Sequence, residues 1–157
     1  MEHYIEISRI EGHIFFEIEF VSHNQLTNDS TKIMLDSGAY LTVISVNTAI
    51  KFGFNKLPYK TLDLRGFTGS TPAKLITVPG IKIADWVITQ VNILVPFNKE
   101  IKQEVLGQNV LEYFNYNVKH DEDRIYFTKN PMPKPQAKYK NLLGCGDVFS
   151  TSLHEVQ

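Results

Sequence analysis

The chain has 157 residues, the length of one domain with a short extension. Hydrophobic residues make up 43% and charged residues 21%, which is enough apolar material for a globular core. The formal net charge is -1 and Lys and Arg form no basic stripe, so we expect no nucleic-acid partner, because phosphate binding needs clustered positive charge.

The sequence favours a cytoplasmic protein. Its single cysteine, Cys145, cannot form a disulfide within the chain, and a lone thiol suits a reducing compartment. Residues 1–6 do not form a basic region that leads into an apolar run, so we expect no signal peptide. No uninterrupted apolar stretch is long enough for a bilayer, so we expect no membrane partner.

Strand patterns dominate the first part of the chain. Apolar side chains alternate over residues 14–20, which predicts a half-buried strand. Glu11-Gly12 reads as a turn before it, so residues 4–8 are its predicted hairpin partner. Residues 24–30 are polar and predicted to form a loop, and residues 32–35 form a short apolar run.

The remaining elements follow as short strands with few helices. Residues 43–45 are predicted to be a strand, after which Ser45 caps a short helix that runs to about Phe52 and stops at Gly53. We then expect a hairpin with a glycine-rich tip at 62–78 and one or two strands at 81–95, broken near Ala84-Asp85. A short helix is expected at 107–114 and a last hairpin at 116–127.

The composition changes after Lys129. Residues 130–136 hold three prolines, which cannot donate to a strand ladder, so the folded domain is predicted to cover residues 1–129. Residues 130–157 are predicted to form a C-terminal tail, either flexible or regulatory. A regulatory tail would be cleaved or would block a cleft.

One segment combines the residue types of a catalytic loop. Asp36 ends the apolar run at 32–35, where a carboxylate is not needed for solubility. Ser37 supplies a hydroxyl, Gly38 permits a tight turn, and Thr42 adds a second hydroxyl that can brace the loop. The competing interpretation is an ordinary turn in which Asp36 bonds to its own backbone.

The context of this segment resembles a known family. Residues 35–44 are similar to the active-site loop of retropepsin-like aspartic proteases, whose pattern is hydrophobic, Asp, Thr or Ser, Gly, Ala, two variable residues, Thr or Ser, hydrophobic. Residues 105–111 match a second signature of that family, and the hairpin at 62–78 lies between the two, where the family has its flap. The resemblance extends over residues 4–127.

The resemblance implies an all-β fold: a closed barrel of the acid-protease type with a flap hairpin and one or two short helices. It implies an aspartic endopeptidase that acts on polypeptides through a homodimer. Aspartic peptidases use two carboxylates that share a proton and activate a water. The chain has a single Asp-Ser-Gly-Ala segment, so we expect a second chain to supply the other Asp36. No organic cofactor or metal is expected, since water is the nucleophile.

The resemblance also implies roles for individual residues. Ser37 would hydrogen-bond across the two-fold axis, the Gly38 amide would help to hold the carboxylate, Ala39 would pack beneath the loop and Thr42 would be a buried support. A structural loop behind the site is expected to contain Gly107 and Asn109. A flap is expected to contain Gly66, Phe67, Thr68, Gly69 and Ser70. The plainer interpretations are an exposed hairpin turn and a capped helix start.

Two departures and one alternative remain. Ser37 replaces the threonine that is usual in retroviral members but keeps the hydroxyl, and Tyr40 stands where they carry an aspartate that binds the substrate backbone. The alternative function is a non-catalytic, dimeric peptide-binding module on the same barrel. The histidines show no spacing typical of metal ligands: His3, His13, His23, His120 and His154.

Overall fold

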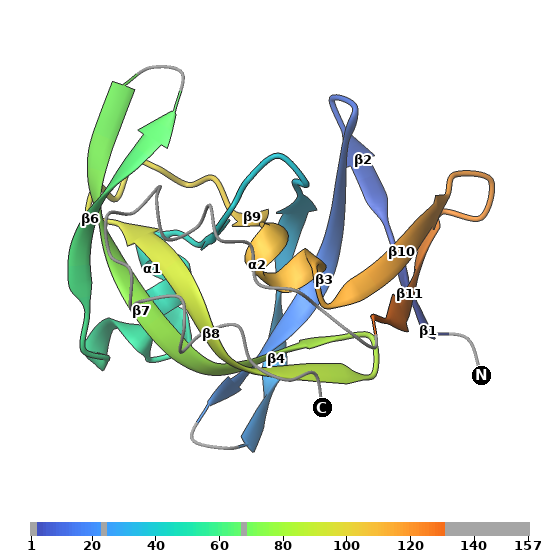
Figure 1. Ribbon diagram of the computed structural model, residues 1–157, viewed down its shortest axis with the longest axis horizontal. Coiled ribbons are helices and arrows are strands. Elements are labelled where there is room, and N and C mark those ends of the chain that lie inside the picture. Colours follow the sequence, from blue (N-terminus) through green and yellow to red (C-terminus); the bar gives the residue numbers. More distant parts are fainter. Residues whose placement is uncertain (1–2, 23–24, 67–68, 131–157) are drawn as a thin grey trace.

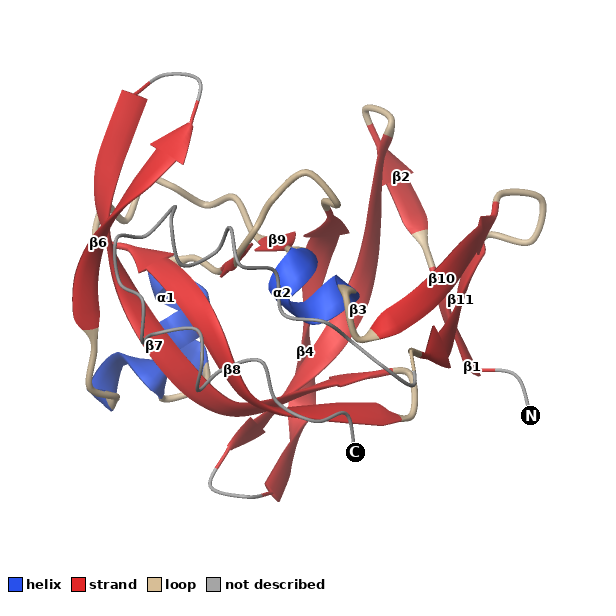
Figure 2. Cartoon of the chain, viewed as in Figure 1, coloured by secondary structure: helices blue, strands red, loops and turns tan. Residues whose placement is uncertain are grey.

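The structure is a computed structural model that describes residues 3–22, 25–66 and 69–130. Strands make up most of this part, and Figure 2 shows the helices as short segments between them. In chain order, the elements are β1 (His3–Glu6), β2 (Ser8–Ile10), β3 (His13–Ser22), β4 (Gln25–Leu35), β5 (Thr42–Val43), α1 (Val46–Lys51), η1 (Phe54–Lys56), β6 (Lys60–Gly66), β7 (Gly69–Ile83), β8 (Trp86–Pro96), β9 (Val105–Leu106), α2 (Gln108–Leu111), β10 (Phe114–Lys119) and β11 (Arg124–Lys129).

The main sheet closes into a barrel. Its strands lie in the order β2-β3-β4-β9-β5-β8-β7-β6, and β3 also pairs with β7, so that the strands from β3 round to β7 form a ring. Strands β2 and β6 are the first and last strands of the sheet and lie outside the ring, as Figure 1 shows for the β6–β7 hairpin. The predicted all-β closed barrel with short helices is confirmed.

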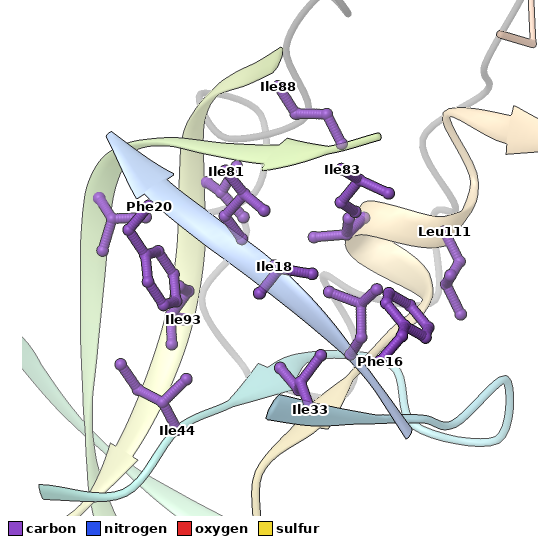
Figure 3. Packing of buried hydrophobic residues seen from close by; sticks show 14 of the residues in the cluster. Phe16, Ile18, Phe20, Ile33, Ile44, Ile81, Ile83, Ile88, Ile93 and Leu111 are labelled. Carbon is purple, nitrogen blue, oxygen red and sulfur yellow. The ribbon is translucent and has the colours of Figure 1, made fainter. Parts of the chain in front are cut away.

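The core follows from the alternation in β3. Phe16, Ile18 and Phe20 are buried along this strand, and Figure 3 shows them among isoleucines of neighbouring strands. Burial of each such side chain contributes roughly 1.5–3 kcal/mol. The ring of Phe20 meets those of Phe52 and Phe54 edge-on, with centroids 4.8 and 5.2 Å away, so the α1 segment is fixed to the barrel.

Helix α1 begins and ends where its sequence predicts. The Ser45 hydroxyl accepts a hydrogen bond from the Thr48 amide (3.2 Å), as an N-cap does. Phe52 is the C-cap, and Gly53 follows in the left-handed conformation (φ 78°), which favours glycine.

Two predictions about the first strands are wrong. Residues 25–30 are not a loop, because their backbone continues the β3–β4 ladder as far as the pair Ser22 and Gln25. A polar strand carries no alternation signal, so only its pairing reveals it. Of the predicted hairpin partner, residues 4–6 pair with β11 and not with β3, and only Ser8, the first residue of β2, lies in the hairpin with β3 around Glu11-Gly12.

A second sheet, β1-β11-β10, lies beside the barrel, at the right of the view in Figure 1. Phe127 of β11 anchors it, with ring centroids 5.8 Å from Phe16 and 5.4 Å from Phe114. The predicted last hairpin is therefore confirmed as β10 and β11. The predicted tail falls almost wholly on residues 131–157, which lie outside the described residues, and the domain division stays a prediction.

Candidate active site

The barrel places Asp36 at the end of β4. Leu35 lies beside Leu106 of the parallel strand β9, and the Asp36 amide donates to the Leu106 carbonyl (3.2 Å). The backbone of Asp36 is therefore the last part of the chain held in the barrel before the loop begins. Its side chain is only half-buried, so the carboxylate stands at the surface end of a rigid strand.

The turn after Asp36 holds the carboxylate. The Gly38 amide donates to Asp36 Oδ1 (3.0 Å), and the Ala39 amide donates to the Asp36 carbonyl (3.2 Å). The first bond is the one expected of Gly38, and an ordinary turn would contain it too. Within the described residues, Oδ2 of Asp36 has no hydrogen-bond partner.

Thr42 braces the loop from inside. Its side chain is fully buried, and both its amide and its hydroxyl donate to Asn109 Oδ1 (3.0 Å each). The same hydroxyl accepts a hydrogen bond from the Gly107 amide (3.1 Å). The Asn109 amide group donates in turn to the Asn92 carbonyl of β8 (2.8 Å). This buried network ties the loop to the barrel wall, the arrangement that strengthens hydrogen bonds in a dry interior.

Gly107 permits the loop behind the site to approach closely. A Cβ atom at Gly107 would lie 2.5 Å from the Leu41 carbonyl carbon and 2.6 Å from its oxygen, so no side chain fits there. The contact lets two backbone hydrogen bonds form, from the Gln108 amide to the Ala39 carbonyl (2.8 Å) and from the Asn109 amide to the Tyr40 carbonyl (3.1 Å). The two segments that the sequence singled out are therefore neighbours.

The sequence patterns miss one residue of this site, Gln108, and one residue beside it, Glu104. Gln108 Nε2 donates to the Ser37 carbonyl (2.6 Å), but Gln108 occupies the variable position of the second signature. The Glu104 carboxylate accepts bonds from the Ser45 amide (3.0 Å) and from the hydroxyls of Ser45 and Thr31 (3.3 Å each). An acidic residue directly before buried Val105 is the signal that would have identified it.

An apolar cluster lies next to the Asp36 loop and joins it to the β6–β7 hairpin. Its buried members come from several barrel strands and the loop: Met34, Leu41, Val43, Ala73, Leu75, Leu94 and Val105. Partly buried side chains pack against these: Phe15, Ala39, Leu62 and Leu64. Ala39 of the loop and the two leucines of β6 therefore share one apolar surface beside Asp36.

The hairpin expected to be the flap is present as β6 and β7, and its ladder extends further into the expected tip than predicted. Gly66 of β6 lies opposite Gly69 of β7, and Arg65 opposite Ser70. Gly69 has φ 117°, a conformation that favours glycine, and both Gly69 and Ser70 are exposed. Phe67 and Thr68, the expected tip, lie outside the described residues.

Two further properties concern residues 3–22, 25–66 and 69–130. No three His, Cys, Asp or Glu side chains in these ranges come together as metal ligands would. None of the helices there has the length and apolar character of a membrane span.

Comparisons with known proteins identify the family and the fold of the chain. The family model of the gag-polyprotein putative aspartyl protease matches residues 23–113, more than half of the chain, from β4 through the Asp36 loop to the end of α2. The crystal structure of a retropepsin-like aspartic protease from Rickettsia conorii has the same fold, with a TM-score of 0.57 and 24% identity over 81% of this chain and 90% of that one. No curated protein matches the chain by sequence. The chain belongs to the gag-polyprotein putative aspartyl protease family, which is retropepsin-like.

Proposed function

We propose that the chain is an aspartic endopeptidase in which two copies each contribute one Asp36 to a single active site. The observation that carries the proposal is the state of this carboxylate. Gly38 holds Oδ1 from one side, while Oδ2 has no hydrogen-bond partner among the described residues. A carboxylate held in this way is oriented on one oxygen and keeps the other for a water or for a second carboxylate.

The second copy completes the chemistry. One ionised carboxylate takes a proton from the attacking water, while the other, protonated, polarises the carbonyl of the scissile bond. In the described part of the chain no other acid is hydrogen-bonded to Asp36. The loop surface is open to a partner at Ser37 and Gly38, which are both exposed. Family membership supports this arrangement, because retropepsin-like proteases act as dimers.

The substrate is a polypeptide with apolar side chains near the cleaved bond. Ala39 of the loop and Leu62 and Leu64 of β6 are only partly buried, so they leave apolar side-chain surface beside Asp36. Because the two leucines belong to the β6–β7 hairpin, its closure over a bound peptide would exclude water from the site. The single cysteine supports a cytoplasmic setting.

The experiment compares the parent chain with Asp36→Asn on a mixed peptide library, from mildly acid to neutral pH. This change keeps the shape of the side chain and removes the acid, so we expect cleavage to fall on the order of a thousandfold. Asp121→Asn is the matched control, because Asp121 is exposed in the turn between β10 and β11 and should leave cleavage unchanged.

The same comparison tests the alternative, a non-catalytic peptide-binding module. Such a module would bind peptides without cleaving them, and Asp36→Asn would leave its binding intact. Equal cleavage by the parent and Asp36→Asn, or no cleavage by either across the pH range, would reject the endopeptidase. Light scattering of both chains should show dimers, because the substitution removes a charge and leaves the loop backbone unchanged.

A further inference from the structure

The side chain of Gln108 and the carboxylate of Asp36 are connected through one peptide group. Gln108 Nε2 donates to the carbonyl of Ser37 (2.6 Å), and the amide of Gly38 donates to Asp36 Oδ1 (3.0 Å). That carbonyl and that amide belong to the same peptide group, between residues 37 and 38. Because a peptide group is planar and rigid, a bond that fixes one end of it also sets the direction of the other end.

We propose that Gln108 is a positioning residue for Asp36, which it orients through the peptide group between Ser37 and Gly38. The inference rests on the proposed function, in which Asp36 carries out the chemistry. Gln108 does not touch the reacting atoms. It determines whether the Gly38 amide faces the carboxylate.

This peptide group needs such a restraint. Ser37 and Gly38 are both exposed, and glycine permits backbone rotations that other residues do not. A rotation of the peptide plane would turn the Ser37 carbonyl, instead of the Gly38 amide, towards Asp36 Oδ1. A carbonyl oxygen cannot donate to a carboxylate, so the bond at 3.0 Å would be lost. The Gln108 bond stabilises the orientation in which the amide donates.

The position of Gln108 makes the restraint stiff. Its own amide donates to the Ala39 carbonyl (2.8 Å), and the next amide, of Asn109, donates to the Tyr40 carbonyl (3.1 Å). The preceding residue, Gly107, lies against the backbone of Leu41. The donor therefore comes from a backbone that is already bonded to the loop it holds. A bond to the Ser37 carbonyl also polarises the peptide group and strengthens the Gly38 amide as a donor.

The main test uses Gln108→Met, which keeps the length of the side chain and removes the donor. On a peptide that the parent cleaves, we expect kcat to fall about tenfold or more, because small displacements of a catalytic group are costly, while KM changes less than about twofold. Gln108→Lys restores a donor and should recover kcat to within about threefold of the parent. In Gln108→Asn the side chain is one methylene shorter, so its amide no longer reaches the Ser37 carbonyl. This variant should behave like Gln108→Met, and it replaces Gln108→Met in the test if that variant does not fold.

A spectroscopic measurement detects the effect of the Gln108 hydrogen bond on the Gly38 amide independently of cleavage activity. In ¹H–¹⁵N spectra, the Gly38 amide signal should move upfield in Gln108→Met, as expected for a weaker hydrogen bond, and lie near its parent position in Gln108→Lys. Gln103→Met is the matched control, since Gln103 is exposed and precedes β9, and it should move neither the signal nor kcat.

The outcomes separate this proposal from the function on which it rests. Equal cleavage by the parent and Asp36→Asn would reject the peptidase, and the Gly38 signal would still report on the Gln108 contact. If cleavage depends on Asp36 but Gln108→Met keeps the parent kcat, or leaves the Gly38 signal in place, the positioning role is overturned. A loss of kcat that Gln108→Lys does not restore also overturns it, because the donor would then not be the cause.

Discussion

The Asp36 loop and the β6–β7 hairpin contribute to one apolar cluster, but they are held in different ways. Residues 36–42 of the loop are bonded to residues 106–109 through backbone and side-chain groups, with Thr42 fully buried. Strand β6 is the outermost strand of its sheet and pairs only with β7, and its outward side chains are exposed. Strand β7 pairs with β8 from Ala73 onwards, but beyond the β6–β7 ladder β6 packs on the cluster only through the partly buried Leu62 and Leu64.

This difference fits the two tasks that we propose, catalysis by the Asp36 loop and closure by the hairpin. A catalytic carboxylate has to be held within a few tenths of an ångström, which requires locked neighbours. A lid has to open for the substrate and close over it, so it belongs to the less stable parts of a fold. We therefore expect changes behind the loop to reduce stability and kcat together, and changes on the hairpin to act mainly on KM.

The largest effect is expected for Gly107→Ala. The added methyl group would meet the backbone of Leu41, which cannot move without breaking the bonds between the loop and residues 107–109. We expect a loss of about 3 kcal/mol in the free energy of unfolding, measured by urea denaturation, and no measurable cleavage.

Gly53→Ala is the matched control for that change. A Cβ atom there meets nothing within 4 Å, but Gly53 has φ 78°, so only backbone strain of about 1 kcal/mol is expected and cleavage should persist. If both glycine changes reduced stability equally, the close approach at Gly107 would not be what holds the loop.

A smaller effect is expected for Thr42→Val, which keeps the shape of the side chain and removes its hydroxyl. The Gly107 amide would lose its acceptor in a buried site, at about 2 kcal/mol. Thr42→Ser retains the hydroxyl and should lose about 1 kcal/mol, the contribution of a buried methyl group. Urea denaturation of both variants checks the order, and a more stable Thr42→Val than Thr42→Ser would contradict the role of the network.

On the other side of the comparison, Leu64→Ala should leave the loop intact. Leu64 is only partly buried, so the loss in the free energy of unfolding should be about 1 kcal/mol. We expect KM to rise severalfold with kcat within about twofold of the parent, as measured by steady-state kinetics. A fall in kcat at unchanged KM would show that the hairpin, like the loop, orients the catalytic group.

The smallest effect is expected far from both regions, at Glu122. The Tyr126 hydroxyl donates to Glu122 Oε1 (2.6 Å) and lowers the pKa of that carboxyl, and Lys119 and Arg124 lower it further. A lowered pKa in the folded state stabilises the fold above the unfolded-state pKa, and this contribution is lost as the pH falls through the folded-state value. Glu122→Gln should therefore lower Tm slightly at neutral pH. At a pH below the folded-state pKa of Glu122 it should leave Tm unchanged, and cleavage should be unchanged throughout. A large fall in Tm at neutral pH would contradict this.

The sequence predicted the parts of the fold that local signals encode. Alternation revealed β3, and the capping residue Ser45 with Gly53 marked both ends of α1. Pairing between distant segments has no local signal, so the partner of β1 and the polar start of β4 were predicted wrongly.

Among the site residues, the sequence singled out Asp36, Thr42, Gly107 and Asn109 and left Gln108 unnoticed. The structure brings these residues together, but their roles in catalysis stay predictions. The motif shows that Gly107 is glycine but not why, because the reason is the distant backbone of Leu41. Gln108 acts through its side-chain length and direction, which a variable position in a pattern does not express.

The central claim is that each active site uses the Asp36 of two chains. Parent chains are refolded together with a threefold excess of Asp36→Asn chains, at fixed parent concentration, and the cleavage rate is compared with that of parent chains alone. If subunits pair at random and both carboxylates are required, about one quarter of the parent rate should remain, because only that share of parent chains finds a parent partner. A rate that is unchanged, or that rises because mixed dimers are active, would show that one Asp36 is sufficient and would contradict the account.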